Sequence, residues 1–153
     1  KHMASTQLVD DIIEVIADVL EMEIDEIELD SRIVADLGAD SLDIVDMSFS
    51  LGKQLSIKMP QKTVMMHAED ILGDANDMLD NDAVTELGAE LLRSGPNRYS
   101  EEDVYPGKTL AEIFADTKVC HWVNLCTAIK NSGLSGDDLI QQQVKAVLET
   151  EAA

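Results

Sequence analysis

The sequence predicts an all-α fold, and three observations carry that prediction. Apolar residues recur at steps of three and four, the spacing that places side chains on one face of an α-helix. No segment gives a convincing strand pattern, and serine, threonine and aspartate stand where helices would start. Only 3% of the residues are aromatic although 45% are hydrophobic, so the core must be aliphatic. A chain of 153 residues is long enough to bury such a core as one domain.

Composition also limits the partners. The 31 acidic and 11 basic residues give a net charge of −20, which repels nucleic acid and anionic membranes and favours a basic protein partner. No apolar run is long enough to span a membrane. Residues 1–5 resemble a cloning scar, and no signal peptide is visible. Cys120 and Cys126 are too few for a disulfide framework, so we expect a reducing, cytoplasmic location.

The first 60 residues divide into two helices and a loop. One apolar stripe predicts a helix from about Thr6 to Met22. Residues 23–40 are expected to form a long acidic loop, which ends in the segment 36–40, where Gly38 allows a backbone turn. A second helix is expected over 41–55, with Asp40 or Ser41 as its cap. Pro60 stops anything that follows.

The remaining residues predict further helices. The spacing indicates helices over 63–72 and 82–93, followed by breaks at 94–98 and 105–108. Thr109 and Glu112 have the spacing of a capping box. Two more helices are expected, over 119–130 and from about 135 onward.

Ser41 is the residue whose setting suggests chemistry. It follows an acidic loop and a glycine turn at the start of a helix, where unpaired N–H groups and the helix dipole favour a phosphate. A plain helix cap is the simpler interpretation. Ser41 lacks the G-x-S-x-G pattern of a hydrolase nucleophile, and nothing places His67 or His121 beside it as a base. We therefore expect a protein that is not an enzyme.

The octet 36–43, Asp-Leu-Gly-Ala-Asp-Ser-Leu-Asp, resembles the signature of acyl carrier proteins, and residues 6–60 keep that family's spacing. The resemblance implies that Ser41, flanked by Asp40 and Leu42, carries 4′-phosphopantetheine, whose thiol holds acyl intermediates as thioesters. It further implies fatty-acid, polyketide or other specialised lipid biosynthesis, with a phosphopantetheinyl transferase and acyl-loading and acyl-processing enzymes as partners. We expect a monomer. A peptidyl or aminoacyl carrier of a nonribosomal pathway, and an unmodified acidic adaptor, remain alternatives.

One side of the second helix is the expected partner surface. Three aspartates recur there at three-residue steps beside an apolar strip, and the resemblance implies that such acids meet Arg and Lys of partner enzymes. Family members often continue the acidic face near the end of this helix, where this chain has Gly52-Lys53-Gln54. The expected partner-binding residues are Asp36, Asp40, Leu42, Asp43, Val45, Asp46 and Phe49.

The length exceeds that of common carriers. We expect a single enlarged carrier domain over 6–153, in which 61–104 is a helical insertion and 105–153 holds the last carrier helix, starting near Lys108–Phe114, and extra C-terminal helices. In the alternative threading, 63–80 supplies the family's short third and fourth helices. The insertion could shelter a bulky acyl group among flexible apolar side chains, namely Met59, Met65, Met66, Ile71 and Leu72.

No metal site is expected. The acidic run from Asp74 lacks the oxygen ligand, glycine and glutamate that a calcium loop needs at its fifth, sixth and twelfth positions. His67 with its acidic neighbours is too sparse a set for a transition metal. Cys120 and Cys126 lack paired-cysteine spacing, so we expect them, with Trp122, to be core residues.

Overall fold

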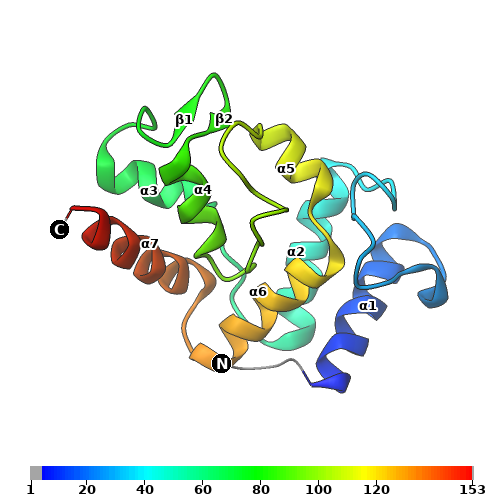
Figure 1. Cartoon of the computed structure of the whole chain (residues 1–153). Helices are drawn as coiled ribbons and strands as arrows, with labels where there is room; N and C mark the ends of the chain where they lie inside the picture. The colour runs from blue at the N-terminus through cyan, green and yellow to red at the C-terminus, as the bar shows by residue number, and fades with distance from the viewer. Residues whose placement is uncertain (1–4, 153) are drawn as a thin grey trace.

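The computed structural model describes residues 5–152, and almost all of its elements are helical (Figure 1). This confirms the all-α prediction, and the four helices expected over 6–22, 41–55, 63–72 and 119–130 are present within two residues of those bounds. In chain order the elements are α1 (Thr6–Leu20), the 3₁₀ turn η1 (Ile24–Glu26), α2 (Ser41–Leu55), α3 (Val64–Leu72), β1 (Leu79–Asp80), β2 (Ala83–Val84), α4 (Glu86–Arg93), α5 (Leu110–Asp116), α6 (Val119–Ser132) and α7 (Gly136–Ala152).

A short hairpin departs from the all-helical expectation. The strands β1 and β2 pair antiparallel, with Leu79 opposite Val84. Between them Asn81 and Asp82 have φ of 52° and 67°, the left-handed conformation of a two-residue hairpin turn, which Asn and Asp tolerate. The helix expected from position 82 therefore begins only after Thr85, whose hydroxyl accepts the Gly88 N–H at 3.2 Å.

The first core lies between α1, α2 and α6. Ile12 and Ile16 of α1 and Met47 and Leu51 of α2 have no exposed surface, and they pack in one cluster with the buried face of α6 around Val119. Side chains of the acidic loop complete this core from outside the helices, notably Ile27, Ile33 and Ala39.

The second core belongs to residues after Pro60. Helices α3, α4 and α7 share a cluster that includes Met65, Met78, Leu91 and Val144, so the C-terminal helix packs on the segment that was expected to be an insertion. Figure 1 shows these three helices together on the side of the molecule opposite α1. The described residues thus form two large aliphatic cores, with two smaller clusters of buried residues beside them.

Polar contacts join the second core to the end of the carrier-like part. Asp137, in the first turn of α7, accepts the N–H groups of Gln61 at 3.0 Å and Lys62 at 3.1 Å. The same carboxylate lies 2.9 Å from Nε2 of buried His67 on α3. Burial opposes ionisation of Asp137, but these hydrogen bonds outweigh it and hold its pKa below the usual value.

The helix around Lys108–Phe114 forms but does not join the first core. Its capping box is confirmed, since Thr109 and Glu112 each accept the other's backbone N–H, at 3.1 and 2.9 Å. Ile113 of this helix, α5, packs with Val84 and Val104 of the segment that was expected to be an insertion. The helix that packs against α1 and α2 is α6.

Several smaller expectations fall on particular residues. Residues 1–4 of the expected cloning scar lie outside the described residues, whereas Ser5 caps α1 by accepting the Leu8 N–H at 3.1 Å. Cys126 is fully buried and Cys120 half-buried, and both are free thiols. Trp122 packs partly buried against the first core. Over residues 5–152 no helix is long and apolar enough to cross a membrane, and no cluster of metal-ligating side chains occurs.

Replacing Asp137 should destabilise the fold selectively. Asp137→Ala removes the acceptor of two backbone N–H groups and the partner of His67, so we expect the free energy of unfolding to fall by about 2 kcal/mol. Asp138→Ala is the matched control, because Asp138 occupies the same helix turn and is exposed. Urea unfolding at neutral pH measures both variants, and equal losses would contradict the prediction.

The native chain and Asp137→Ala should also differ in how their stability responds to acid. Because the folded-state pKa of Asp137 lies below the ordinary 3.8, its contribution is complete above that pH. The stability gap between the native chain and Asp137→Ala should narrow as the pH falls below 3.8 and close as it passes the lowered pKa.

Candidate functional site

The loop before α2 is fixed by its own turn and by the chain beyond α5. Gly38 has φ of +78°, the left-handed conformation that glycine adopts freely, and its N–H donates to the Val34 carbonyl at 3.1 Å. The Ala39 N–H then donates to the Ile33 carbonyl at 3.1 Å, which brings the chain back onto the core. On the other side, the Ile33 N–H donates to the Thr117 carbonyl at 3.0 Å. The start of α2 is therefore presented from a loop held on two sides.

Asp40, and not Ser41, is the cap of α2. Its carboxylate accepts the Asp43 N–H at 2.9 Å, and Asp43 accepts the Asp40 N–H at 3.0 Å, which completes a capping box. The sequence left the choice between Asp40 and Ser41 open. Because aspartate takes the role, the exposed hydroxyl of Ser41 makes no hydrogen bond to any other described residue.

The surroundings of Ser41 suit a phosphodiester. Ser41 is the first residue of α2, at the positive end of a 15-residue helix. The backbone N–H groups of Ser41 and Leu42 donate to no acceptor within residues 5–152, so they remain available to phosphate oxygens. The neighbouring carboxylates of Asp40 and Asp43 are held on backbone N–H groups instead of extending over the hydroxyl. A phosphopantetheine group attached at this hydroxyl therefore fits the residues present.

The predicted acidic residues do not form one continuous patch. Asp40, Asp43 and Asp46 follow one another on α2, and Asp40 and Asp46 are exposed. Asp36 lies in the loop, where its carboxylate pairs with Arg32 at 2.9 Å, and this guanidinium holds the pKa of Asp36 below its usual value. Asp36 thus forms an ion pair within the chain, whereas Asp40, Asp43 and Asp46 form none with the described residues.

The predicted apolar strip of α2 is on the surface. Leu42, Val45 and Phe49 are 74, 63 and 71% exposed, although large apolar side chains usually turn inward. We call these three residues the α2 apolar strip. Beside it lies a groove of about 740 Å³ that continues past Gly52 to Met59. Exposed apolar side chains in a row next to a groove are typical of a protein contact site.

The far end of α2 carries positive charge. The Nζ of Lys53 lies 6.0 Å from the centre of the Phe49 ring, a cation–π distance, and Lys53 and Lys58 both line the groove. The surface therefore changes from acidic beside Ser41 to basic beyond Phe49, as the Gly52-Lys53-Gln54 departure indicated.

A small apolar cavity lies behind the start of α2. It encloses about 140 Å³ between the acidic loop, α2, α5 and α6, and Ile33, Ile44, Phe114 and Trp122 are among its lining residues. Ile44 is three residues after Ser41, so the cavity begins within one helical turn of the candidate attachment point. Sequence analysis missed this cavity because Phe114 and Trp122 reach it from helices whose placement no local pattern gives.

The five apolar residues expected to shelter an acyl group do not gather around one cavity. Met65 is buried in the second core, Met59 packs partly buried against the first, and Met66 is 50% exposed. Ile71 and Leu72 lie on the outer side of α3, about 40% exposed.

Comparison with known proteins matches the first part of the chain. The family model described as the phosphopantetheine attachment site matches residues 10–71. The acyl carrier protein of Sulfurovum sp. (strain NBC37-1) is 38% identical over 74 residues, which is 48% of this chain and 96% of the relative. That of Clostridium perfringens (strain SM101 / Type A) is 43% identical over 53 residues, 35% of this chain and 70% of the relative. No solved structure matches significantly.

Truncating a side chain on the exposed face of α2 should change the stability much less than truncating one on its buried face. Phe49→Ala should change the free energy of unfolding by no more than about 0.5 kcal/mol, because the ring is already exposed. Met47→Ala, two residues away on the same helix, should cost about 3 kcal/mol because the side chain is fully buried. Chemical denaturation of both variants makes the test, and a large loss in Phe49→Ala would show that the strip belongs to the core.

Proposed function

The chain belongs to the acyl carrier protein family, and from this premise we propose that it tethers acyl intermediates through a 4′-phosphopantetheine group on Ser41. Members of this family are carriers and not enzymes, and they bear that prosthetic group covalently. The observation that carries the assignment to Ser41 is its free, exposed hydroxyl at the start of α2, which the Asp40–Asp43 capping box leaves without a structural role.

The prosthetic group supplies a terminal thiol, which holds the acyl group as a thioester. The chain's own residues provide the rest. Gly38 turns the loop so that α2 starts at the surface, and the N–H groups of Ser41 and Leu42 face the position of the phosphate. The hydrogen-bonded turn at Gly38 would hold Ser41, and with it the attachment point of the group, at the surface.

The small cavity behind α2 would shelter the beginning of an acyl chain. Its lining is mainly apolar, and Ile44 places it one turn from Ser41. A cavity of roughly 150 Å³ is enough to bind benzene. The 140 Å³ here therefore accommodate a group of about that size without rearrangement, which favours a short acyl chain or the first carbons of a longer one. Fatty-acid, polyketide and specialised lipid biosynthesis all use such chains.

The partner surface would be the start of α2 together with the α2 apolar strip. The aspartates at positions 40, 43 and 46 attract basic enzymes, among them the phosphopantetheinyl transferase, and the strip gives the contact an apolar centre. Lys53 and Lys58 at the far end would repel an enzyme whose basic surface continued along the whole helix. We therefore infer that the acyl-loading and acyl-processing enzymes that bind this chain are a dedicated set.

The structure supports a particular threading of the enlarged domain. We propose that α6 is the last carrier helix, because it closes the first core against α1 and α2. The match to the family model continues through α3 to residue 71, but α3 packs in the second core and not against α1 and α2. Helices α3 and α4, with the hairpin, would therefore be the insertion, and α7 would extend the carrier to cover it. Helix α5 would be the short helix before the last one, where it joins the acidic loop to the inserted segment.

The attachment site is tested by intact mass spectrometry after incubation with coenzyme A and a broad-specificity phosphopantetheinyl transferase. The native chain should gain the mass of one phosphopantetheine group, and Ser41→Ala should gain none while losing at most about 1 kcal/mol of stability. Ser48→Ala, on the same helix, should be modified like the native chain. Modification of Ser41→Ala would refute the assignment to Ser41. If neither the native chain nor its variants were modified under conditions that modify a known carrier, the assignment would also be refuted and the adaptor alternative favoured.

Reversing one charge on α2 tests the partner surface. Asp46→Lys should lower kcat/KM of the transferase about tenfold, because it removes an attractive charge and adds a repulsive one at an exposed site. The matched control is Asp18→Lys, an equal change of charge at an exposed position of α1, which should have little effect. Initial rates at low and high salt measure this, and the difference between the variants should shrink as salt rises.

A further inference from the structure

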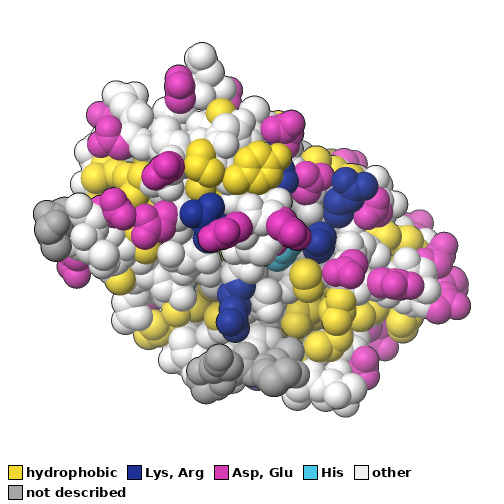
Figure 2. Space-filling model, viewed as in Figure 1, with side chains coloured by type: hydrophobic (Ala, Val, Ile, Leu, Met, Phe, Trp, Pro, Cys, Tyr) yellow, Lys and Arg dark blue, Asp and Glu magenta, His cyan; other side chains and the backbone are white. Residues whose placement is uncertain are grey.

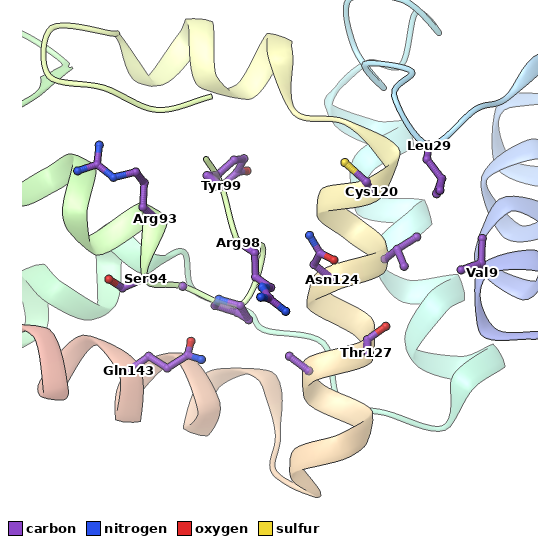
Figure 3. Close-up of a pocket in the computed structure, with 14 residues that line it drawn as sticks. Val9, Leu29, Arg93, Ser94, Arg98, Tyr99, Cys120, Asn124, Thr127 and Gln143 are labelled. Atoms are coloured by element: carbon purple, nitrogen blue, oxygen red, sulfur yellow. The ribbon is translucent and has the colours of Figure 1, made fainter. Parts of the chain in front are cut away.

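A broad cleft of about 840 Å³ lies on α6, apart from the start of α2 (Figure 3). Its floor is one face of α6, with Cys120, Asn124 and Thr127 spaced by helical steps. Val9 of α1 and Leu29 of the acidic loop lie at one side, and the segment after α4 forms the opposite wall, with Gln143 of α7 below it. No residue of α2 lines the cleft, so it is separate from the candidate attachment site.

The charge of the cleft is opposite to that of the protein. Acidic residues number 31 in the whole chain, yet none lines the cleft, whereas Arg93 and Arg98 both do. These are two of the three arginines in the sequence. Figure 2 shows Lys and Arg side chains across the middle of this face, with Asp and Glu side chains between and around them. An anion is repelled by most of the surface of this protein, and the two arginines make this cleft, like the lysine end of the groove beside α2, a place that attracts it.

Arg98 lines the cleft, and its side chain has no partner among the described residues. Its backbone has φ of +60°, which non-glycine residues rarely adopt and which is often found at binding sites. Within residues 5–152, its guanidinium makes no ion pair or hydrogen bond. Arg93, by contrast, is fixed, because its Nη1 donates to the Val104 carbonyl at 2.9 Å.

Two buried polar atoms at the cleft lack hydrogen-bond partners. Both Oγ1 of Thr127 and Oε1 of Gln143 are enclosed and have no partner among the described residues, and Thr127 is only 6% exposed. Most buried polar groups are paired, and an unpaired one costs about 1–3 kcal/mol. Both residues line the same cleft. The Thr127 hydroxyl can donate as well as accept, so an acceptor oxygen of a ligand that reached it would restore one lost hydrogen bond, whereas Gln143 Oε1 only accepts.

Apolar side chains make up the rest of the lining. Val9, Leu29, Pro96 and Val123 contribute to it, together with Ala128. The cleft therefore offers one guanidinium without a partner, that of Arg98, one unpaired hydroxyl that can donate, that of Thr127, and apolar side chains beside the polar face of α6. From this combination we propose that the cleft binds a small amphipathic carboxylate, whose acid group pairs with Arg98 and whose apolar body lies along α6 between Pro96 and Val9.

The proposal is tested with sodium octanoate as the probe, titrated into the full chain carrying Ser41→Ala so that the result does not depend on the prosthetic group. Heteronuclear NMR should show shifts of backbone amides in 95–99 and 120–128. Arg98→Gln should weaken the affinity about tenfold, because it removes the charge-assisted hydrogen bonds. Octanol, which has the same apolar body without the charge, should bind the native cleft with similarly reduced affinity.

Lys53→Gln is the matched control, since it removes one positive charge from α2 outside the cleft, and it should leave octanoate affinity unchanged within about twofold. A second variant, Ala128→Trp, fills the cleft from α6 and should abolish the shifts. Equal affinity in Arg98→Gln and Lys53→Gln, shifts confined to the small cavity around Ile44, or no binding of millimolar octanoate would each overturn the proposal.

Discussion

The backbone pairing between the acidic loop and the α5–α6 junction is the constraint on which the site depends. Residues 29–35 accept from or donate to residues 115–120 through four backbone hydrogen bonds, including those from Val119 to Ser31 and from Cys120 to Leu29, both 2.9 Å. Arg32 adds ion pairs to Asp36 and Asp116. A long loop pays a large entropic cost to become ordered. Here the cost is offset along its whole length, so the turn at Gly38 and the start of α2 have a defined position.

The same pairing explains how the chain accommodates residues 61–104 without disturbing that site. This segment begins after Pro60 and leads back through α5, whose C-terminal end contacts the loop by way of Asp116. Asp116 also pairs with buried Lys108, and this contact holds the pKa of Asp116 below its usual value. Helices α3 and α4 bury their apolar residues with α7. Since neither core borrows side chains from the exposed side of α2, the partner surface stays free.

Local patterns in the sequence predicted what local chemistry determines. The periodicity of α1 and α2, the glycine turn and the Thr109–Glu112 box each depend on neighbouring residues, and all are present. The exposure of Phe49 also followed from its position on the helix. Most of what failed required knowledge of distant partners. The ion pair between Arg32 and Asp116 and the division of the methionines between two cores are set by tertiary packing. The pair between Asp36 and Arg32, four residues apart, was by contrast a local contact that the sequence analysis missed. The cleft on α6 was invisible because its walls come from four separate segments.

The net charge of −20 is therefore a poor description of how this protein meets other molecules. Several positive side chains are used internally: Arg32, Lys62 and Lys108 all form ion pairs with aspartates. Asp40 and Asp43 cap α2 and remain near the surface. Arg93 and Arg98 line the cleft beside α6, away from these aspartates. Intramolecular pairing thus leaves the aspartates at the start of α2 and the guanidinium of Arg98 beside α6 as separate charged groups without ion-pair partners among the described residues. A basic enzyme and an anionic small molecule would be drawn to different places, so both could be bound at once.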